Sequence, residues 1–472
     1  MSWFQSSSTW PREDKVQISV DTVRAIWGAE IHNVSEGTSF TRLNIAYIKE
    51  FETGGVGDGK ELYFIVYKDN PREEGWYINA FDRTRNIPKL RQRSNIVFVV
   101  DGRVSDSDMH GLKYIRVRDV FLAIDQLREH VLSTINPLVV GVTGSVGKTT
   151  TAAMIQSILS RRFECGRVYS KRLTPLNLSS WIANYLGPSH QVLCLEYSMY
   201  RPHHIEVLTR ILKPRVGILL NIKRVHLGVS GINTLLDIMV AKRPLVEKAE
   251  TAILNADDPL VLSLKRSRDL TFSLTDPNVD AFVESDGDEV SMRLNFTGQS
   301  IRFRPYVRTD LFYYQSLASA LVASFLDVSL EVVSDALNQF RPAENRIGWI
   351  TLRGEKFLFD GDVTHAGRMS ALAENRYSTS ILLIAEFNFG EENVSLQVED
   401  LSLIFSQFSK VRVLDNQVNQ EMLSRYHIKN CLLVPREQFL YGVSRFEFKV
   451  IHFGTYFRRY KDLDRLSTFL GA

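Results

Sequence analysis

Cysteine is scarce in this chain of 472 residues, and the three that occur lie far apart in the sequence. Cys165, Cys194 and Cys431 show no paired spacing, which argues against a disulfide framework and against a thiolate metal site. We therefore expect the protein in a reducing compartment, the cytoplasm.

Long apolar runs are also missing. No stretch of about 18 uninterrupted apolar residues occurs, and residues 1–15 lack a basic start followed by an apolar segment. The apolar share of 44% and the charged share of 24% are typical of a globular protein. We expect a soluble protein that is neither secreted nor inserted in a membrane.

The chain also lacks an excess of charge of one sign. The 57 basic and 54 acidic residues are interspersed and leave a net charge of +3, so no strong electrostatic field is implied. The basic cluster near the C-terminus is interpreted as a solvated helix start; it contains Arg458, Arg459, Lys461 and Arg465. We predict no nucleic-acid partner, and the composition specifies no oligomeric state.

The length predicts about three domains, because a domain usually holds about 100 to 200 residues. Residues 1–136 mix short strands with charged, glycine-containing loops and end where Asn136-Pro137 breaks the chain. Residues 137–344 alternate strand, turn and helix, which predicts βαβ units and a parallel sheet. Residues 345–472 show the same alternation and predict a second open α/β sheet.

The segment Gly141-Val-Thr-Gly-Ser-Val-Gly-Lys148-Thr149-Thr150 carries the clearest chemical signal. It follows an apolar strand and opens a helix, so backbone N–H groups and the positive helix end should point at one phosphate group. Lys148 adds a cation for the β- and γ-phosphates of ATP, and Thr149 adds a hydroxyl for Mg²⁺. The residues predicted to bind the nucleotide are Thr143, Gly144, Ser145, Val146, Gly147, Lys148, Thr149 and Thr150.

The glycine spacing departs from the common Gly-x-x-x-x-Gly-Lys-Thr, because Val142 stands where the first glycine would be. This variant, with its doubled Thr149-Thr150, resembles the Mur ligase family and its relatives, the folylpolyglutamate and cyanophycin synthetases. The resemblance extends over nearly the whole chain and is closest to the branch that joins D-alanyl-D-alanine to a UDP-muramoyl tripeptide. It implies a three-domain α/β fold: a small N-terminal domain, a central P-loop ATPase domain with a parallel sheet, and a C-terminal Rossmann-like domain.

The resemblance also implies a metal site. Glu196 ends a predicted strand where the family has a glutamate that binds Mg²⁺. The segment Asn221-Ile-Lys-Arg-Val-His-Leu resembles the family's Asn-Ile-x-x-x-His-Leu, whose histidine, here His226, is a second magnesium ligand and catalytic residue. Lys242 lies where many members carry a catalytic lysine modified by CO₂ to a carbamate. Taken singly, each could instead be a surface charge, a loop histidine or a solvated helix lysine.

Further positions follow from the same resemblance. Arg346 resembles the arginine between domains that contacts nucleotide phosphate, and Asp360 echoes an Asp-Asp-x-Tyr motif that contacts the nucleotide. Thr174 and Asn177 resemble a substrate-binding Thr-Pro-x-Asn segment. Departures occur on the substrate side: no clear Asp-Ser-Arg stands in the N-terminal domain, and Ser179-Ser180 replaces paired asparagines.

The reaction implied is an ATP- and Mg²⁺-dependent joining of a carboxylate to an amine through an acyl phosphate, with release of ADP and phosphate. The departures favour a small-molecule acid and an amino acid or peptide other than the usual substrates. The alternative is the peptidoglycan reaction itself, the addition of D-alanyl-D-alanine to UDP-muramoyl tripeptide. A hypothesis of another class is a nucleotide-binding switch or module without ligation.

Overall fold

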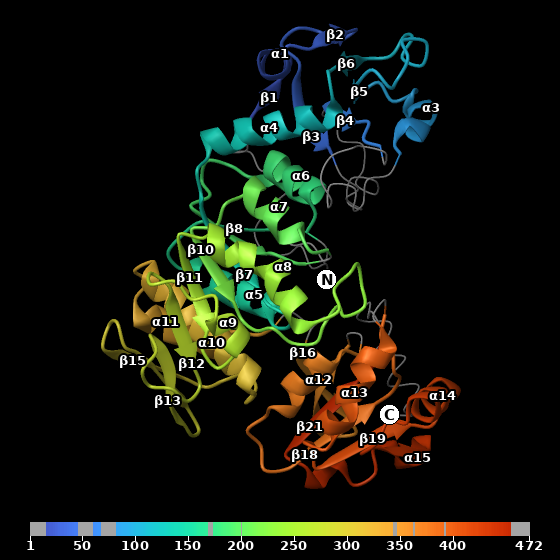
Figure 1. Ribbon diagram of the computed structural model, residues 1–472. Helices are drawn as coiled ribbons and strands as arrows, with labels where there is room; N and C mark the ends of the chain where they lie inside the picture. The colour runs from blue at the N-terminus through green and yellow to red at the C-terminus, as the bar shows by residue number, and fades with distance from the viewer. Residues whose placement is uncertain are drawn as a thin grey trace. The chain divides into compact units, whose positions relative to one another are not determined.

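The computed structural model describes residues 16–45, 60–67, 82–168, 173–199, 201–342, 347–361, 364–390 and 393–454 (Figure 1). Contacts divide the chain into two compact units. The first comprises Met1–Val139, Phe163–Leu195 and Glu206–Lys213, and the second comprises Val140–Arg162, Glu196–Ile205 and Pro214–Ala472. Among the helices in the described ranges, none is long and apolar enough to cross a bilayer.

The N-terminal sheet has six strands in the order β1-β3-β4-β5-β6-β2. Its middle strands are parallel, and β1 and β2 pair antiparallel at the two edges. Strand β5 is a run of five buried apolar residues, as expected for a strand covered on both faces. The elements are β1 Ile18–Ser19, α1 Val20–Trp27, β2 Glu30–His32, β3 Ser39–Asn44, β4 Lys60–Phe64, η1 Thr84–Asn86, α3 Ile87–Leu90, β5 Ile96–Val100, β6 Tyr114–Arg116 and α4 Val120–Thr134.

Helix α6 (Pro175–Tyr185) is attached to this N-terminal sheet by a buried side chain. The amide of Asn184 accepts a hydrogen bond from Leu43 N at 2.9 Å and donates one to Leu43 O at 2.8 Å. Arg128 of α4 donates to the hydroxyl of Ser179 at 3.2 Å. Contacts therefore group α6 with the first unit, whereas the predicted domain boundaries after residues 136 and 344 stay predictions.

The central sheet has nine strands in the order β15-β14-β13-β12-β11-β10-β7-β9-β8. The pairs from β7 through β10, β11 and β12 to β13 are parallel, which confirms the predicted parallel α/β sheet. Strands β13, β14 and β15 form an antiparallel extension that the sequence did not predict. The strands are β7 Leu138–Thr143, β8 Cys165–Val168, β9 Val192–Glu196, β10 Val216–Leu219, β11 Thr251–Asn255, β12 Leu270–Ser273, β13 Ala281–Asp286, β14 Val290–Leu294 and β15 Gln299–Phe303.

Several of the helices that accompany this sheet begin at a polar side chain that caps them. The hydroxyl of Thr234 accepts from Asp237 N, and the Asp237 carboxylate accepts from Thr234 N in return, which forms a capping box. Helix α10 begins after Thr309 and packs against α5 and α11. The helices are α5 Lys148–Leu159, α7 His204–Ile211, α8 Leu235–Lys248, α9 Pro259–Leu262, α10 Asp310–Phe325 and α11 Leu330–Gln339.

The register of the central strands gathers their carboxyl ends at one edge. Thr143 of β7 pairs with Leu219 of β10, and Leu219 pairs with Leu254 of β11. The segments that follow these three strands therefore lie next to one another, where ligands bind in open parallel sheets. This edge holds the predicted phosphate loop.

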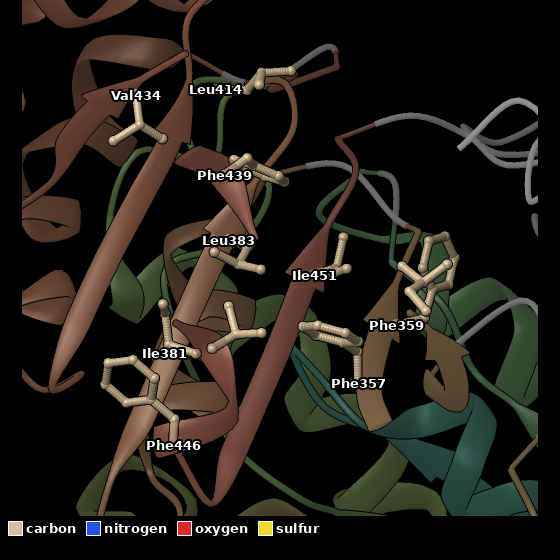
Figure 2. Close-up of a cluster of buried hydrophobic side chains, with 11 residues drawn as sticks. Phe357, Phe359, Ile381, Leu383, Leu414, Val434, Phe439, Phe446 and Ile451 are labelled. Carbon is tan, nitrogen blue, oxygen red and sulfur yellow. The ribbon is translucent and has the colours of Figure 1, made fainter. Parts of the chain in front are cut away.

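The C-terminal sheet has six strands in the order β16-β17-β21-β18-β19-β20, all parallel except β16. Figure 2 shows the apolar cluster on one face of this sheet, where alternate residues such as Ile381 and Leu383 of β18 point the same way. Phe439 covers the cluster from outside the sheet. The elements are β16 Ile347–Leu352, β17 Glu355–Asp360, α12 Ala366–Ala373, β18 Ser380–Ile384, α13 Val394–Phe405, β19 Lys410–Leu414, α14 Gln417–Tyr426, β20 Leu432–Val434, α15 Arg436–Phe439, η2 Val443–Arg445 and β21 Phe448–His452.

Candidate functional site

The phosphate loop connects β7 to α5 through a turn that requires glycine. Gly147 is the N-terminal cap of α5 and has a φ of 91°, in the left-handed region that favours glycine. A Cβ atom at this position would lie 2.9 Å from Nε2 of Gln315. The positive end of α5 therefore meets a tight loop, an arrangement suited to an anion.

The first glycine of the motif has a different role. Gly141 lies inside β7, paired with Gly217 of β10, and a Cβ atom on it would lie 2.7 Å from the ring of Tyr197. The hydroxyl of Thr143 donates to Tyr197 O at 2.8 Å. Gly141 thus leaves room for the ring of Tyr197 beside β7.

The side chain of Lys148 folds over the loop. Its Nζ donates to the carbonyl oxygens of Gly144 and Ser145 at 2.9 and 3.0 Å. Thr149 and Thr150 continue into the first turn of α5. The eight nucleotide-binding residues predicted in this segment thus lie on one strand–loop–helix unit, and their contacts with ATP stay predictions.

Asn221 holds this loop in shape, although the sequence did not single it out as a site residue. Its Oδ1 accepts from the main-chain nitrogens of Ser145 and Val146, both at 3.0 Å, and its Nδ2 donates to Val146 O at 3.1 Å. Asn221 is buried and follows the end of β10. Its place after a strand, at the ligand-binding edge of the sheet, is the signal that could have found it.

The structure brings two of the three predicted metal ligands together. Thr149 Oγ1 donates to Glu196 Oε2 at 2.6 Å, and the hydroxyl of Ser198 donates to the other carboxylate oxygen at 3.1 Å. Within the described part of the chain, no group of three His, Cys, Asp or Glu side chains is arranged to hold an ion. A hydroxyl and a carboxylate fit Mg²⁺, which prefers oxygen ligands and keeps several positions for water and phosphate.

Lys242 is buried beneath the loop rather than solvated on α8. Its side chain is among the largest that are fully buried, with a relative exposure of 1% for the residue, and its Nζ donates to Gly144 O at 2.9 Å. Burial lowers the pKa of Lys242 well below its usual value; the charge of Lys148 lowers it further, and Glu196 opposes the shift. The alternative of a solvated helix lysine is therefore wrong, and the catalytic role of Lys242 stays a prediction.

His226 lies in the segment that follows β10, close to a second histidine. Its φ is 65°, a left-handed conformation, and its ring centre is 6.3 Å from that of His365. His365 is the N-terminal cap of α12 and was not singled out in the sequence. The role of His226 as a metal ligand and catalytic residue stays a prediction.

Asp360 ends β17 and is fully buried. Its Oδ1 accepts from Arg368 Nε at 2.7 Å, and its Oδ2 contacts His452 Nδ1 at 2.9 Å. Burial raises the pKa of the Asp360 carboxyl, but Arg368 and His452 outweigh burial and lower it overall. The structure thus places Asp360 in an internal ion pair, and its predicted contact with the nucleotide stays a prediction.

The predicted substrate residues lie at the start of α6. The hydroxyl of Thr174 accepts from Asn177 N at 3.2 Å and caps the helix, and Thr174 is fully buried. Substrate binding by Thr174 and Asn177 stays a prediction. Arg346, the predicted phosphate contact, lies outside the described residues.

Comparison with known proteins agrees with this geometry. Residues 142–322 match the Mur ligase middle domain. The UDP-N-acetylmuramoyl-tripeptide--D-alanyl-D-alanine ligase of Buchnera aphidicola is 26% identical over 263 residues, which cover 52% of this chain and 54% of that protein. The chain spans about half the length of the curated relatives it matches first.

Solved structures extend the similarity in fold. MurF from Acinetobacter baumannii superposes with a TM-score of 0.74 at 17% identity, over 97% of this chain and all of that one. MurF ligase from Thermotoga maritima in complex with ADP gives 0.67 at 18% identity, over 87% of this chain and 95% of that one. The predicted resemblance is confirmed: residues 142–322 are similar in sequence to the Mur ligase middle domain, and the chain shares the three-domain α/β fold of Mur ligases.

Proposed function

We propose that this protein is an ATP-dependent ligase that joins a small-molecule carboxylate to an amine, with formation of ADP and phosphate. The observation that carries the proposal is that the side chains of Thr149, Glu196 and Lys242 all lie at one loop. The loop meets the Thr149–Glu196 pair at the start of α5, and the buried amine of Lys242 binds the loop carbonyl of Gly144. A plain strand-to-helix turn would need neither the pair nor the buried amine.

The chemistry follows from what each group can do. A substrate carboxylate oxygen attacks the γ-phosphorus of ATP, the bond to the β-phosphate oxygen breaks, and an acyl phosphate and ADP form. The amine nitrogen then attacks the acyl carbon, phosphate leaves with the electron pair of the C–O bond, and the amine loses a proton. Lys148, already over the loop, would stabilise the charge that develops on the phosphoryl oxygens.

Magnesium would be held by the hydroxyl of Thr149 and the carboxylate of Glu196, with His226 as a further ligand. When bound, Mg²⁺ neutralises phosphate charge and orients the transferring group. The oxygen pair at 2.6 Å is the observation that supports this assignment. Asn221 would keep the loop amides of Ser145 and Val146 in place as nucleotide binds.

We extend the proposal to a carbamate on Lys242. Its nitrogen, in the neutral amine form, would attack the carbon of CO₂ and lose a proton, which places an anion where the buried amino group was. The support is positional, because the amino group is buried and lies 2.9 Å from the loop carbonyl of Gly144. A mass measurement that finds Lys242 unmodified in active protein would contradict this part of the proposal.

Two pairs of substrates are compatible with the ligase reaction. An acid and an amino acid or peptide other than the usual ones are favoured by Ser179 and Ser180, which are buried in α6. The second candidate is the reaction in the relative's name, in which D-alanyl-D-alanine is joined to UDP-N-acetylmuramoyl tripeptide. We propose the cytoplasm as the compartment in either case.

The experiment is a screen of ADP release by the purified protein with ATP and Mg²⁺. Single amino acids, dipeptides and candidate acids are added in pairs, and UDP-muramoyl tripeptide with D-alanyl-D-alanine forms one arm. A ligase should release ADP only when its acid is present and form amide only with its amine. ADP release that no acid or amine changes would contradict the ligase and favour a nucleotide-binding switch.

A further inference from the structure

Lys223 is attached to the phosphate loop by its main chain. Its nitrogen donates to Ser145 Oγ at 2.8 Å, and Ser145 Oγ donates to the carbonyl oxygen of Lys223 at 2.9 Å. Ser145 N in turn donates to the side chain of Asn221 at 3.0 Å. A displacement of residue 223 would therefore move the loop residue Ser145.

The side chain of Lys223 is held by a carboxylate of the C-terminal part of the chain. Its Nζ donates to both oxygens of Glu374, at 2.6 and 2.8 Å, and the hydroxyl of Ser370 donates to the same carboxylate at 2.7 Å. The Lys223 and Glu374 side chains are only 24% and 32% exposed. An ion pair that is partly buried, and whose carboxylate is oriented by a third group, is stronger than a fully exposed ion pair.

The segments on either side of this ion pair also approach closely. A Cβ atom on Gly367 of α12 would lie 3.0 Å from Cβ of Lys223. The carbonyl of Glu374 accepts from Asp310 N, at the start of α10, at 3.0 Å. Gln315, farther along α10, donates to Gly147 O at 3.3 Å. Glu374 is thus connected to the phosphate loop by two independent routes.

We propose that Lys223 is a positioning residue that couples the phosphate loop to the segment Ala366–Glu374. The main chain of Lys223 shapes the loop through Ser145, and its ammonium group anchors that main chain to Glu374. A loop that is already held in its binding conformation spends no binding energy on becoming ordered, so this anchor should strengthen nucleotide binding. That part of the inference rests on the proposed function. Lys223 itself need not touch the nucleotide.

Charge reversal tests the coupling in the full chain. Lys223→Glu, Glu374→Lys and the double variant are compared with wild type, and Arg304→Glu, which reverses one partner of the exposed Arg304–Glu289 pair, is the matched control. The readouts are the dissociation constant of a fluorescent ADP with Mg²⁺, and hydrogen exchange of residues 144–146 without nucleotide. Lys223→Met and Glu374→Gln replace any reversed variant that does not fold.

Each single reversal should raise the ADP dissociation constant about three- to tenfold and speed exchange of the loop amides, and the double variant should recover most of both losses. Arg304→Glu should change neither. Single variants that match wild type in both readouts, or a double variant as impaired as the singles, would overturn the coupling. If wild type binds no ADP, the proposed function fails, and hydrogen exchange still decides the role of Lys223.

Discussion

Replacing Lys242 by methionine should abolish activity without lowering the stability of the fold. The amino group of Lys242 is buried and donates to Gly144 O, and Lys148 donates to the same carbonyl, also at 2.9 Å. Methionine has a similar length and no charge, so the variant loses the buried amine while the Gly144 carbonyl keeps a partner. We expect Lys242→Met to fold and to lose ADP formation.

The effect on stability has a definite sign. Burial first, and then the charge of Lys148, lower the pKa of Lys242 in the folded protein, whereas an unfolded lysine has a pKa of about 10.4. Between these two pKa values the unfolded chain binds more protons, so the free energy of unfolding rises with pH. One proton contributes at most about 1.4 kcal/mol per pH unit. Lys242→Met removes the free-energy cost of deprotonating this lysine on folding. The variant should therefore be stabilised most at the lower end of the pH range between the two pKa values.

The assay is denaturant unfolding in CO₂-free buffer from about pH 8 to about pH 10, below the unfolded pKa of lysine, together with ADP release. Lys248→Met, on the exposed side of the same helix, is the control and should follow wild type in both measurements. Equal pH slopes for wild type and Lys242→Met would refute the lowered pKa. Normal ADP formation by Lys242→Met would refute its place in the site.

Three other substitutions test the remaining parts of the site. Lys148→Ala should reduce ADP formation at least about a hundredfold, because the phosphoryl charge loses its cation; undiminished turnover in a coupled ADP assay would exclude the nucleotide site. Asn221→Ala leaves Val146 N without its acceptor and removes the donor to Val146 O, whereas Ser145 N keeps the main-chain oxygen of residue 221. The free energy of unfolding should fall by about 1–3 kcal/mol, with weaker ADP binding by calorimetry; unchanged values would show that the loop keeps its conformation without this side chain. Glu196→Gln should raise the Mg²⁺ concentration for half-maximal ADP formation at least about tenfold, and an unchanged Mg²⁺ titration would remove Glu196 from the metal site.

The sequence by itself determined the phosphate loop and the sheet around it. Where the sequence alternates strand, turn and helix, the segments 138–143, 192–196, 251–255 and 410–414 form β7, β9, β11 and β19. These features depend on neighbouring residues, because an apolar run followed by glycine and a helix-forming segment specifies a strand–loop–helix unit locally. Parallel pairing then places strand ends at one edge, so the position of Glu196 could be expected before its contacts were known.

Only the tertiary structure decided which side chains complete the site. Thr149 and Glu196 are 47 positions apart, and Lys223 and Glu374 are 151 apart, so no local pattern connects either pair. A hydrogen bond needs its two heavy atoms within about 3 Å and well aligned, a condition set by packing of whole elements. Lys242 is a further example. The sequence indicated a lysine with a predicted role, but only the packing of whole elements showed that its amine is buried and bonded to Gly144 O.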